Sequence, residues 1–272
     1  MENEVELKTL VRDFWDASSC GEVYAAGQSE RSYYESHRKA RYDLEPYLRD
    51  FARFNEGAGK DVLEIGVGMG ADHVEWARVH PRSLTGIDLT PRAVEHTRKR
   101  LAIYGFESDV RLGDAERMSF DDACFDLVYS WGVLHHSPDT PRAVSEVLRV
   151  LRPGGVARIM VYHKHSLTGY MLWMRYGLLQ GRPFRSLTDI YAGHLESPGT
   201  KAYSIDEARA VFGRFSQVSV RTQLSFGDLL LGAVGRRHNG VLLAIAKKVW
   251  PRRLLKRIAK NHGLFLLIEA RK

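Results

Sequence analysis

The spacing of three glycines and of one aspartate that follows them is the clearest indication of a ligand-binding site in this sequence. Gly66, Gly68 and Gly70 follow a short apolar run, and Asp88 ends a second apolar run about 20 residues later. Glycine lets the backbone turn sharply and approach a ligand closely, and an acidic residue at this distance reaches the hydroxyls of a ribose. The pattern predicts a site for a nucleoside-containing ligand.

The glycines alone leave the identity of that ligand open. Gly66, Gly68 and Ala71 also match the G-x-G-x-x-A form of the dinucleotide fingerprint, so an NAD(P)-dependent oxidoreductase stays an alternative at this point. Further groups come from strand ends downstream, because Asp114 follows a third apolar run and Ser130-Trp131 end a fourth. The carboxyl ends of parallel strands meet at one crevice, where open α/β sheets bind ligands.

Strands and helices alternate along the middle of the chain. Apolar runs at 61–65, 83–89, 109–112, 125–131 and 156–162 predict strands, and helices are expected from Ala71, from Pro91 to about Tyr104, and from Asp139 until Pro153-Gly154-Gly155. Such alternation predicts an α/β fold with a Rossmann-like, doubly wound parallel sheet.

The remaining segments are expected to surround this sheet. Helical patterns at 4–17 and 31–54 predict an N-terminal helical cover, residues 1–54, beside a domain that spans 55–272. Two insertions, 163–203 and 225–261, interrupt the domain and are expected to form a lid, the first as a long loop without repeating structure. A helix at 205–213 and strands at 215–224 and 264–270 complete the expected elements.

Composition narrows the classes of protein that fit. The content of 44% hydrophobic and 27% charged residues is that of a globular protein, and the net charge of +7 resides in one basic segment, since nine Lys and Arg and no acidic residue lie between Leu229 and Ile268. This segment is read as a solvated helical face, a surface for an anionic or lipid-like acceptor or for an anionic membrane, or, least favoured, a nucleic-acid site.

The cysteines and the N-terminal residues indicate the cellular compartment that we expect for the protein. Cys20 and Cys124 form neither a disulfide framework nor a metal pair, no signal peptide is recognised, and no apolar run has the length of about 18 residues that a membrane span needs. A cytoplasmic protein is expected.

Five motifs in order, over roughly residues 55–162, resemble the class I S-adenosylmethionine-dependent methyltransferases. They are similar in particular to the type 11 group, which includes the ubiquinone/menaquinone-biosynthesis methyltransferases. The motifs are VLEIGVGMG (62–70), GIDLT (86–90), GDAERMSF (113–120), FDLVYSWGVLHH (125–136) and LRVLRPGG (148–155). The resemblance implies a seven-stranded sheet with an antiparallel last strand, S-adenosyl-L-methionine as cofactor and S-adenosyl-L-homocysteine as product.

The resemblance also assigns expected roles to residues of the cofactor site. The turn would lie against the methionine part with Glu64 supporting it, Asp88 would accept from both ribose hydroxyls, and Asp114 with the Ala115 amide would read the adenine edge. The complete expected cofactor set is Glu64, Gly66, Val67, Gly68, Gly70, Asp88, Leu89, Asp114, Ala115, Ser130 and Trp131.

The acceptor end is less specified by the sequence. Methyl transfer by in-line displacement needs an acceptor held behind the sulfonium methyl, and a base only where the acceptor must lose a proton. His135, His136 and His163 are the candidate catalytic residues because they follow the fourth and fifth strands. No metal site is expected. The acceptor is expected to be a small, partly apolar molecule, and a cofactor-binding scaffold without activity is the alternative from another class.

Overall fold

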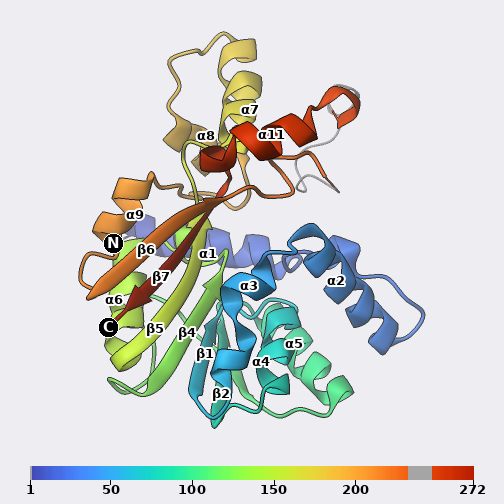
Figure 1. Ribbon diagram of the computed structural model, residues 1–272, viewed down its shortest axis with the longest axis vertical. Coiled ribbons are helices and arrows are strands. Elements are labelled where there is room, and N and C mark those ends of the chain that lie inside the picture. The colour runs from blue at the N-terminus through green and yellow to red at the C-terminus, as the bar shows by residue number, and fades with distance from the viewer. Residues whose placement is uncertain (1, 232–246) are drawn as a thin grey trace.

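The computed structural model describes residues 2–231 and 247–272, and a seven-stranded sheet forms its centre (Figure 1). The spatial order is β3-β2-β1-β4-β5-β7-β6, and only β7 runs against the others. The expected α/β fold with an antiparallel last strand is therefore confirmed. The strands are β1 (Asp61–Ile65), β2 (Ser83–Asp88), β3 (Asp109–Leu112), β4 (Phe125–Trp131), β5 (Leu151–Tyr162), β6 (Gln217–Gln223) and β7 (Phe265–Arg271).

Strand β1 lies between β2 and β4 and is buried along its whole length. Leu63 and Ile65 belong to the apolar core on one face of the sheet, whereas Val62 belongs to the core on the other face. Because the strand is covered on both sides, its apolar residues face both cores instead of alternating with polar ones.

Helices cover both faces of the sheet. α4 (Ala71–Arg78) and α5 (Pro91–Tyr104) pack on one face, and α6 (Thr140–Val150) and α9 (Ile205–Val211) pack on the other. α5 begins as the sequence predicts, because the Thr90 side chain accepts a hydrogen bond from the Ala93 amide and Pro91 occupies the first turn.

The N-terminal residues form helices above the carboxyl ends of the strands. These are α1 (Glu2–Asp16), α2 (Glu30–Leu44) and α3 (Leu48–Ala52), with short 3₁₀ turns η1 (Glu22–Tyr24) and η2 (Phe54–Gly57). Pro46 lies in the break between α2 and α3, before the residue that caps α3. A division of the chain at residue 54 stays a prediction.

The first insertion is helical, so the expectation of a loop without repeating structure is wrong. It contains α7 (Leu167–Tyr176), η4 (Leu178–Gln180) and α8 (Leu187–His194), and serine side chains cap both α-helices. Its apolar side chains form a third core with the ends of β5 and β7, where Tyr162 and Phe265 lie. The sequence missed these helices because their apolar residues occur all round, which removes the usual one-sided period.

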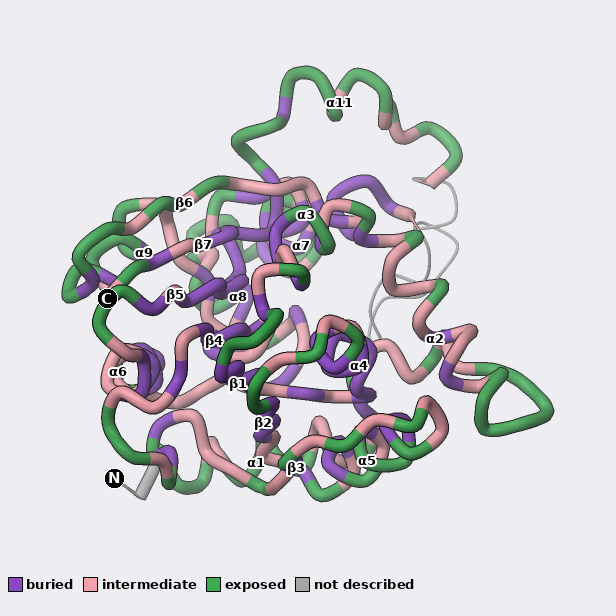
Figure 2. Tube along the Cα trace, turned by 60° about the horizontal axis from the view of Figure 1, so that its bottom comes forward, coloured by how far each residue is buried: buried purple, intermediate pink, exposed green. Residues whose placement is uncertain are grey.

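The second insertion is described in part. It contains α11 (Arg252–Ile258) and η5 (Lys260–His262), and residues 232–246 of the expected insertion lie outside the described residues. Figure 2 shows that buried residues follow the central strands, whereas α11 is mostly exposed. No described helix is long and apolar enough to cross a membrane.

One predicted boundary shifts by several residues. α6 ends at Val150 and β5 begins at Leu151, so Pro153-Gly154-Gly155 lies inside the strand and does not stop the helix. Leu151 pairs with Phe125, and the next paired position, Val156 with Leu127, follows an irregularity in register that accommodates these residues.

Candidate active site

A cavity of about 760 Å³ opens above the carboxyl ends of β1, β2 and β4. Its walls combine the glycine turn after β1, the N-terminal helices α1 and α2, and residues from both insertions. Ten of the fourteen residues expected at the site line it: Glu64, Gly66, Val67, Gly68, Asp88, Leu89, Asp114, Ala115, Trp131 and His136. The edge of the sheet that the sequence singled out is thus the floor of this cavity.

The backbone of the glycine turn would allow a ligand to approach it closely. Gly66 has φ +82°, and a Cβ built there would lie 2.1 Å from Cγ2 of Val133, so a larger residue does not fit. Gly68 has φ +52°, and a Cβ there would meet no atom within 4 Å, so its backbone borders open space. Gly70 does not line the cavity but caps α4 in the left-handed conformation.

Asp88 ties the end of β2 to the glycine turn. One carboxylate oxygen accepts from the Gly68 amide at 3.1 Å, and the other accepts from the Thr90 amide and hydroxyl at 3.0 and 2.9 Å. Burial raises the pKa of Asp88 above its ordinary value, against these hydrogen bonds. The carboxylate is consequently fixed in orientation at the cavity wall.

Glu64 supports the turn through the first helix after it. Its carboxyl lies 2.9 Å from Nδ1 of His73, whose Nε2 lies 2.7 Å from the Ser108 hydroxyl. Burial raises the pKa of Glu64 well above its usual range and lowers the pKa of His73 to about 3. Burial therefore favours the uncharged form of each group.

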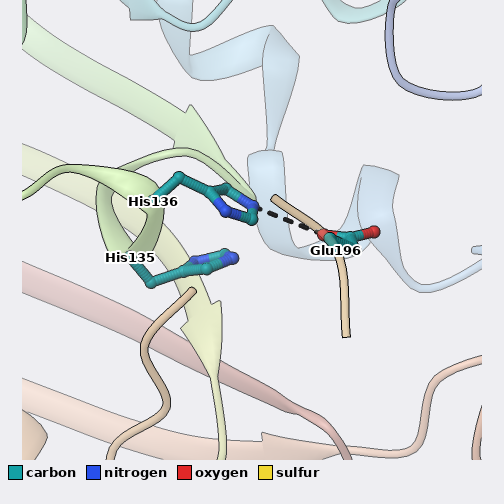
Figure 3. A group of neighbouring side chains, drawn as sticks. All are labelled: His135, His136 and Glu196. Atoms are coloured by element: carbon teal, nitrogen blue, oxygen red, sulfur yellow. Dashed lines mark ion pairs between the residues drawn. The ribbon is translucent and has the colours of Figure 1, made fainter. Parts of the chain in front are cut away.

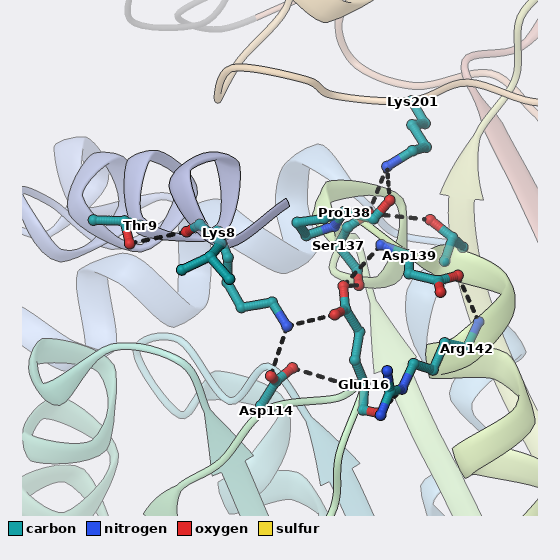
Figure 4. A network of polar contacts seen from close by, with 11 residues as sticks. Lys8, Thr9, Asp114, Glu116, Ser137, Pro138, Asp139, Arg142 and Lys201 are labelled. Carbon is teal, nitrogen blue, oxygen red and sulfur yellow. Dashed lines mark hydrogen bonds and ion pairs between the residues drawn. The ribbon is translucent and has the colours of Figure 1, made fainter. Parts of the chain in front are cut away.

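Asp114 belongs to a polar network that joins α1 to the sheet (Figure 4). Lys8 of α1 donates to Asp114 at 2.7 Å and also to Glu116. Glu116 in turn accepts from the Ser137 hydroxyl and from the Asp139 amide. Lys8 and Glu116 were not predicted from the sequence, and α1 is held across the cavity by this contact.

Arg41 of α2 is a second residue that the sequence did not single out. It lines the cavity, and its guanidinium forms a two-point contact with Asp72, 2.9 and 2.5 Å long. Tyr42 and Tyr129 hydroxyls each donate to the same carboxylate at 2.9 Å. Asp72 therefore has several partners, and Nη1 of Arg41 lies 3.6 Å from a carboxylate oxygen of Glu45. Only the fold brings these residues together, and no local spacing marks them.

His136 and Glu196 meet at the wall of the cavity (Figure 3). Nε2 of His136 lies 3.3 Å from a carboxylate oxygen of Glu196, which also accepts from the Tyr162 hydroxyl at 2.7 Å. Nδ1 of His136 lies 2.9 Å from the Ser197 hydroxyl. Glu196 comes from the first insertion, far from any motif, so no local pattern marks it.

The other expected residues lie outside the cavity wall. His135 is fully buried beneath Tyr162, the ring centroids being 3.9 Å apart, and burial lowers its pKa well below the ordinary value. His163 is buried against the Gly263 carbonyl, and Ser130 donates to the Ile65 carbonyl. None of these three side chains lines the cavity, and the roles expected of them stay predictions.

A metal ion has one candidate place among the described residues. His135, His136 and Glu196 each offer a ligand atom, and these atoms lie within 4.8 Å of one another. The Tyr162 hydroxyl already donates to the Glu196 oxygen that faces His136. The expected absence of a metal stays a prediction.

The comparisons with known proteins support one class over part of the chain, the class I S-adenosylmethionine-dependent methyltransferases. Residues 63–159 match a family model described as a methyltransferase domain. Among solved structures, a complex of the Haloferax volcanii Trm112 methyltransferase activator with a methyltransferase matches with a TM-score of 0.59 at 18% identity, over 96% of each chain. That likeness supports the fold alone. With the matched domain, the recognition made from the five motifs is confirmed, and S-adenosylmethionine is the cofactor of this class.

Curated relatives share mainly this domain. The phthiotriol/phenolphthiotriol dimycocerosates methyltransferase of Mycobacterium leprae is 45% identical over 100 residues, 36% of each chain. A similarly named protein 1 of Mycobacterium ulcerans is 32% identical over 62% of this chain and 63% of its own. The 27-O-demethylrifamycin SV methyltransferase of Amycolatopsis mediterranei is 35% identical over 36% of this chain and 37% of its own. The chain thus matches about a third of the length of the first of these relatives.

Proposed function

We propose that the protein transfers a methyl group from S-adenosylmethionine to a small, partly apolar acceptor, by in-line displacement at the sulfonium methyl. The observation that carries this proposal is a single cavity that joins the glycine turn to an apolar chamber under the first insertion. Such a cavity can hold a nucleoside cofactor and an acceptor end to end, which is the arrangement that transfer requires.

The nucleoside half of the cavity fits the cofactor by its shape and by its hydrogen-bonding groups. The open space over Gly68 admits the cofactor backbone, Asp88 presents acceptors for ribose hydroxyls, and Asp114 with Ala115 borders the place of the adenine. Val67, Leu89 and Trp131 supply apolar walls. When bound, S-adenosylmethionine supplies an electrophilic methyl group, and the protein needs only to bind and orient it.

Arg41 and Glu64 suit the charged amino acid end of the cofactor. Both residues line the cavity. Arg41 contacts Asp72, which lies in the first turn of α4 directly after the glycine turn. A guanidinium pairs with a carboxylate by two parallel hydrogen bonds, so we assign the cofactor carboxylate to Arg41.

The acceptor half of the cavity is apolar. Its walls include Met160, Met171, Leu172, Leu195, Phe226 and Phe265. Apolar walls favour an acceptor with a hydrocarbon part, because contact removes both surfaces from water. The names of the relatives, which act on phthiotriol and phenolphthiotriol dimycocerosates or on 27-O-demethylrifamycin SV, support acceptors of this size and character.

The His136–Glu196 pair is our candidate for proton removal where the acceptor is a hydroxyl. The two groups border the apolar chamber, and Tyr162 and Ser197 fix their orientation. A proton leaving the acceptor would pass to this pair, which can hold it between Nε2 and the carboxylate. His135 is then a packing residue beneath Tyr162 and not the base.

Ligand titration tests the proposal against its alternatives. S-adenosylhomocysteine should raise the melting temperature of the protein, and NADH or NADPH should leave it unchanged. Stabilisation by the nicotinamide cofactors alone would instead indicate the oxidoreductase. A protein that binds S-adenosylhomocysteine but methylates nothing in an extract would be the non-catalytic scaffold.

A further inference from the structure

Exposed apolar side chains gather at one end of the molecule. Twelve large apolar side chains are exposed among the described residues, and eight of them come from two segments, 170–184 and 249–258. We call these eight the apical patch: Tyr170, Met174, Leu178, Leu179, Phe184, Val249, Leu254 and Ile258. Soluble proteins rarely leave apolar groups gathered in this way unless the surface binds a partner.

The two segments lie together in the fold. α7 and α11 are both at the top of Figure 1, and the rings of Tyr170 and His262 are 6.2 Å apart. Nδ1 of His262 lies 3.0 Å from the carbonyl of His165, just before α7. The Trp250 indole donates to the Asp228 carbonyl at 2.9 Å and anchors the start of the second segment. The apical patch therefore comprises two groups of exposed side chains, one on each segment, and His262 links the segments at Tyr170 and His165.

The two segments that carry the apical patch are rich in basic residues. Residues 163–188 and 247–260 contain eleven Lys and Arg and no Asp or Glu. Arg253 and Arg257 are exposed, and no salt bridge in the described part of the chain involves either. Apolar groups interleaved with unpaired cations are typical of surfaces that lie on anionic lipid headgroups.

The cavity opens at this same surface. Met174 and Leu179 belong to the apical patch and also line the cavity, with 53% and 67% of their surfaces exposed. Arg175 and Trp250 line it from the same two segments. An apolar path therefore leads from the outside, past Met174 and Leu179, to the acceptor chamber.

We propose that the apical patch docks on the surface of an anionic lipid bilayer, so that the cavity mouth faces the membrane and an amphiphilic acceptor enters directly from the lipid. This deepens the proposed function and rests on it for the nature of the acceptor. Charge complementarity selects the bilayer as the occupant, since the apolar side chains give a shallow insertion that a nucleic acid could not use.

Vesicle co-sedimentation of the whole protein tests the docking. The wild type should sediment with vesicles of equal parts phosphatidylglycerol and phosphatidylcholine, less so at high salt, and should stay in solution with phosphatidylcholine alone. Arg253→Glu/Arg257→Glu should weaken binding roughly tenfold or more. A matched control, Lys60→Glu/Arg214→Glu, makes the same change of net charge at exposed positions outside the two segments and should bind as the wild type does.

A second variant tests the apolar part of the docking surface. Phe184→Ser/Ile258→Ser should also weaken binding, because both side chains are exposed, by 98% and 68%, and neither lines the cavity. Failure of the wild type to sediment with the anionic vesicles, equal loss in the control, or binding to duplex DNA in place of vesicles would overturn the docking.

The vesicle experiments and the cofactor-binding experiment can fail independently of each other. Stabilisation by S-adenosylhomocysteine should persist in all three variants. If it persists while vesicle binding fails, only the docking is wrong. If vesicle binding holds in a protein that does not bind the cofactor, the proposed function is wrong and the docking stands.

Discussion

At the scale of single residues, Asp88 has structural contacts beside the ribose contact that we propose for it. Its carboxylate also fixes the Gly68 amide and the start of α5, so it joins the second strand to the cofactor turn. To test the proposed ribose contact without disturbing these structural contacts, a variant should remove the charge of Asp88 with little change in shape. Asp88→Asn meets this need, because it keeps the volume and one carbonyl oxygen but loses the charge.

We expect Asp88→Asn to weaken S-adenosylhomocysteine binding by about tenfold to a hundredfold, because hydrogen bonds to a charged acceptor contribute roughly 1.5–3 kcal/mol each. Isothermal titration calorimetry measures this change. Asp109→Asn, at an exposed position on the neighbouring strand β3, is the control and should bind as the wild type does. Unchanged affinity in Asp88→Asn would mean that the ribose lies elsewhere.

Glu196→Gln tests the proposed proton acceptor. With the acceptor that becomes labelled in an extract, we expect kcat to fall by roughly 10²–10⁴ and the acid side of its pH profile to flatten, with cofactor affinity unchanged. Glu207→Gln, whose carboxyl pairs with Lys164 outside the cavity, should leave kcat unchanged. Equal kcat in the two variants would remove Glu196 from the mechanism.

Glu45 provides a test by pH. Burial raises its pKa to about 7, against the attraction of Arg41, so folding favours the protonated form. The stabilisation that protonation gives is complete below the ordinary pKa of 4.5 and is lost as pH rises to about 7. Urea unfolding at several pH values measures the free energy of unfolding of each protein. Between pH 5 and pH 8, that of Glu45→Gln should rise relative to the wild type by roughly 3 kcal/mol. A constant difference between the two proteins would contradict the burial of this group.

At the scale of elements, α1 closes the cofactor end of the cavity. Lys8 holds its middle to Asp114 and Glu116, and the Arg92 amide donates to Asp16 at its end. Glu22, just beyond α1, pairs with the Arg92 side chain, which lowers the pKa of that carboxyl to about 2. Exchange of the cofactor would require these contacts to open.

We expect Lys8→Met to speed release of S-adenosylhomocysteine by about fivefold, because two partly exposed ion pairs together contribute on the order of 1 kcal/mol. Stopped-flow fluorescence can follow release through Trp15, which lines the cavity. Lys39→Met removes an exposed pair with Asp43 on α2 and serves as the control. If both variants release the product at the wild-type rate, α1 is not a gate.

At the scale of the whole molecule, the parts that could be predicted are those with local causes. Gly66, Gly68 and Asp88 lie within one strand–turn–helix unit, so their spacing in sequence fixes their places in space. The sheet followed from the same alternation of strands and helices. Arg41, Glu116 and Glu196 reach the cavity from three other segments, and only tertiary packing sets that juxtaposition. His135 illustrates the converse, because adjacency to His136 says nothing about which ring faces the cavity.

The most direct test of methyl transfer is incubation of the protein with methyl-labelled S-adenosylmethionine and a cell extract, followed by separation into aqueous and organic fractions. The account predicts label in an apolar small molecule of the organic fraction, and much less of it with Glu196→Gln. Label that appears only in protein or nucleic acid, or no label in a protein that binds S-adenosylhomocysteine, would contradict the account.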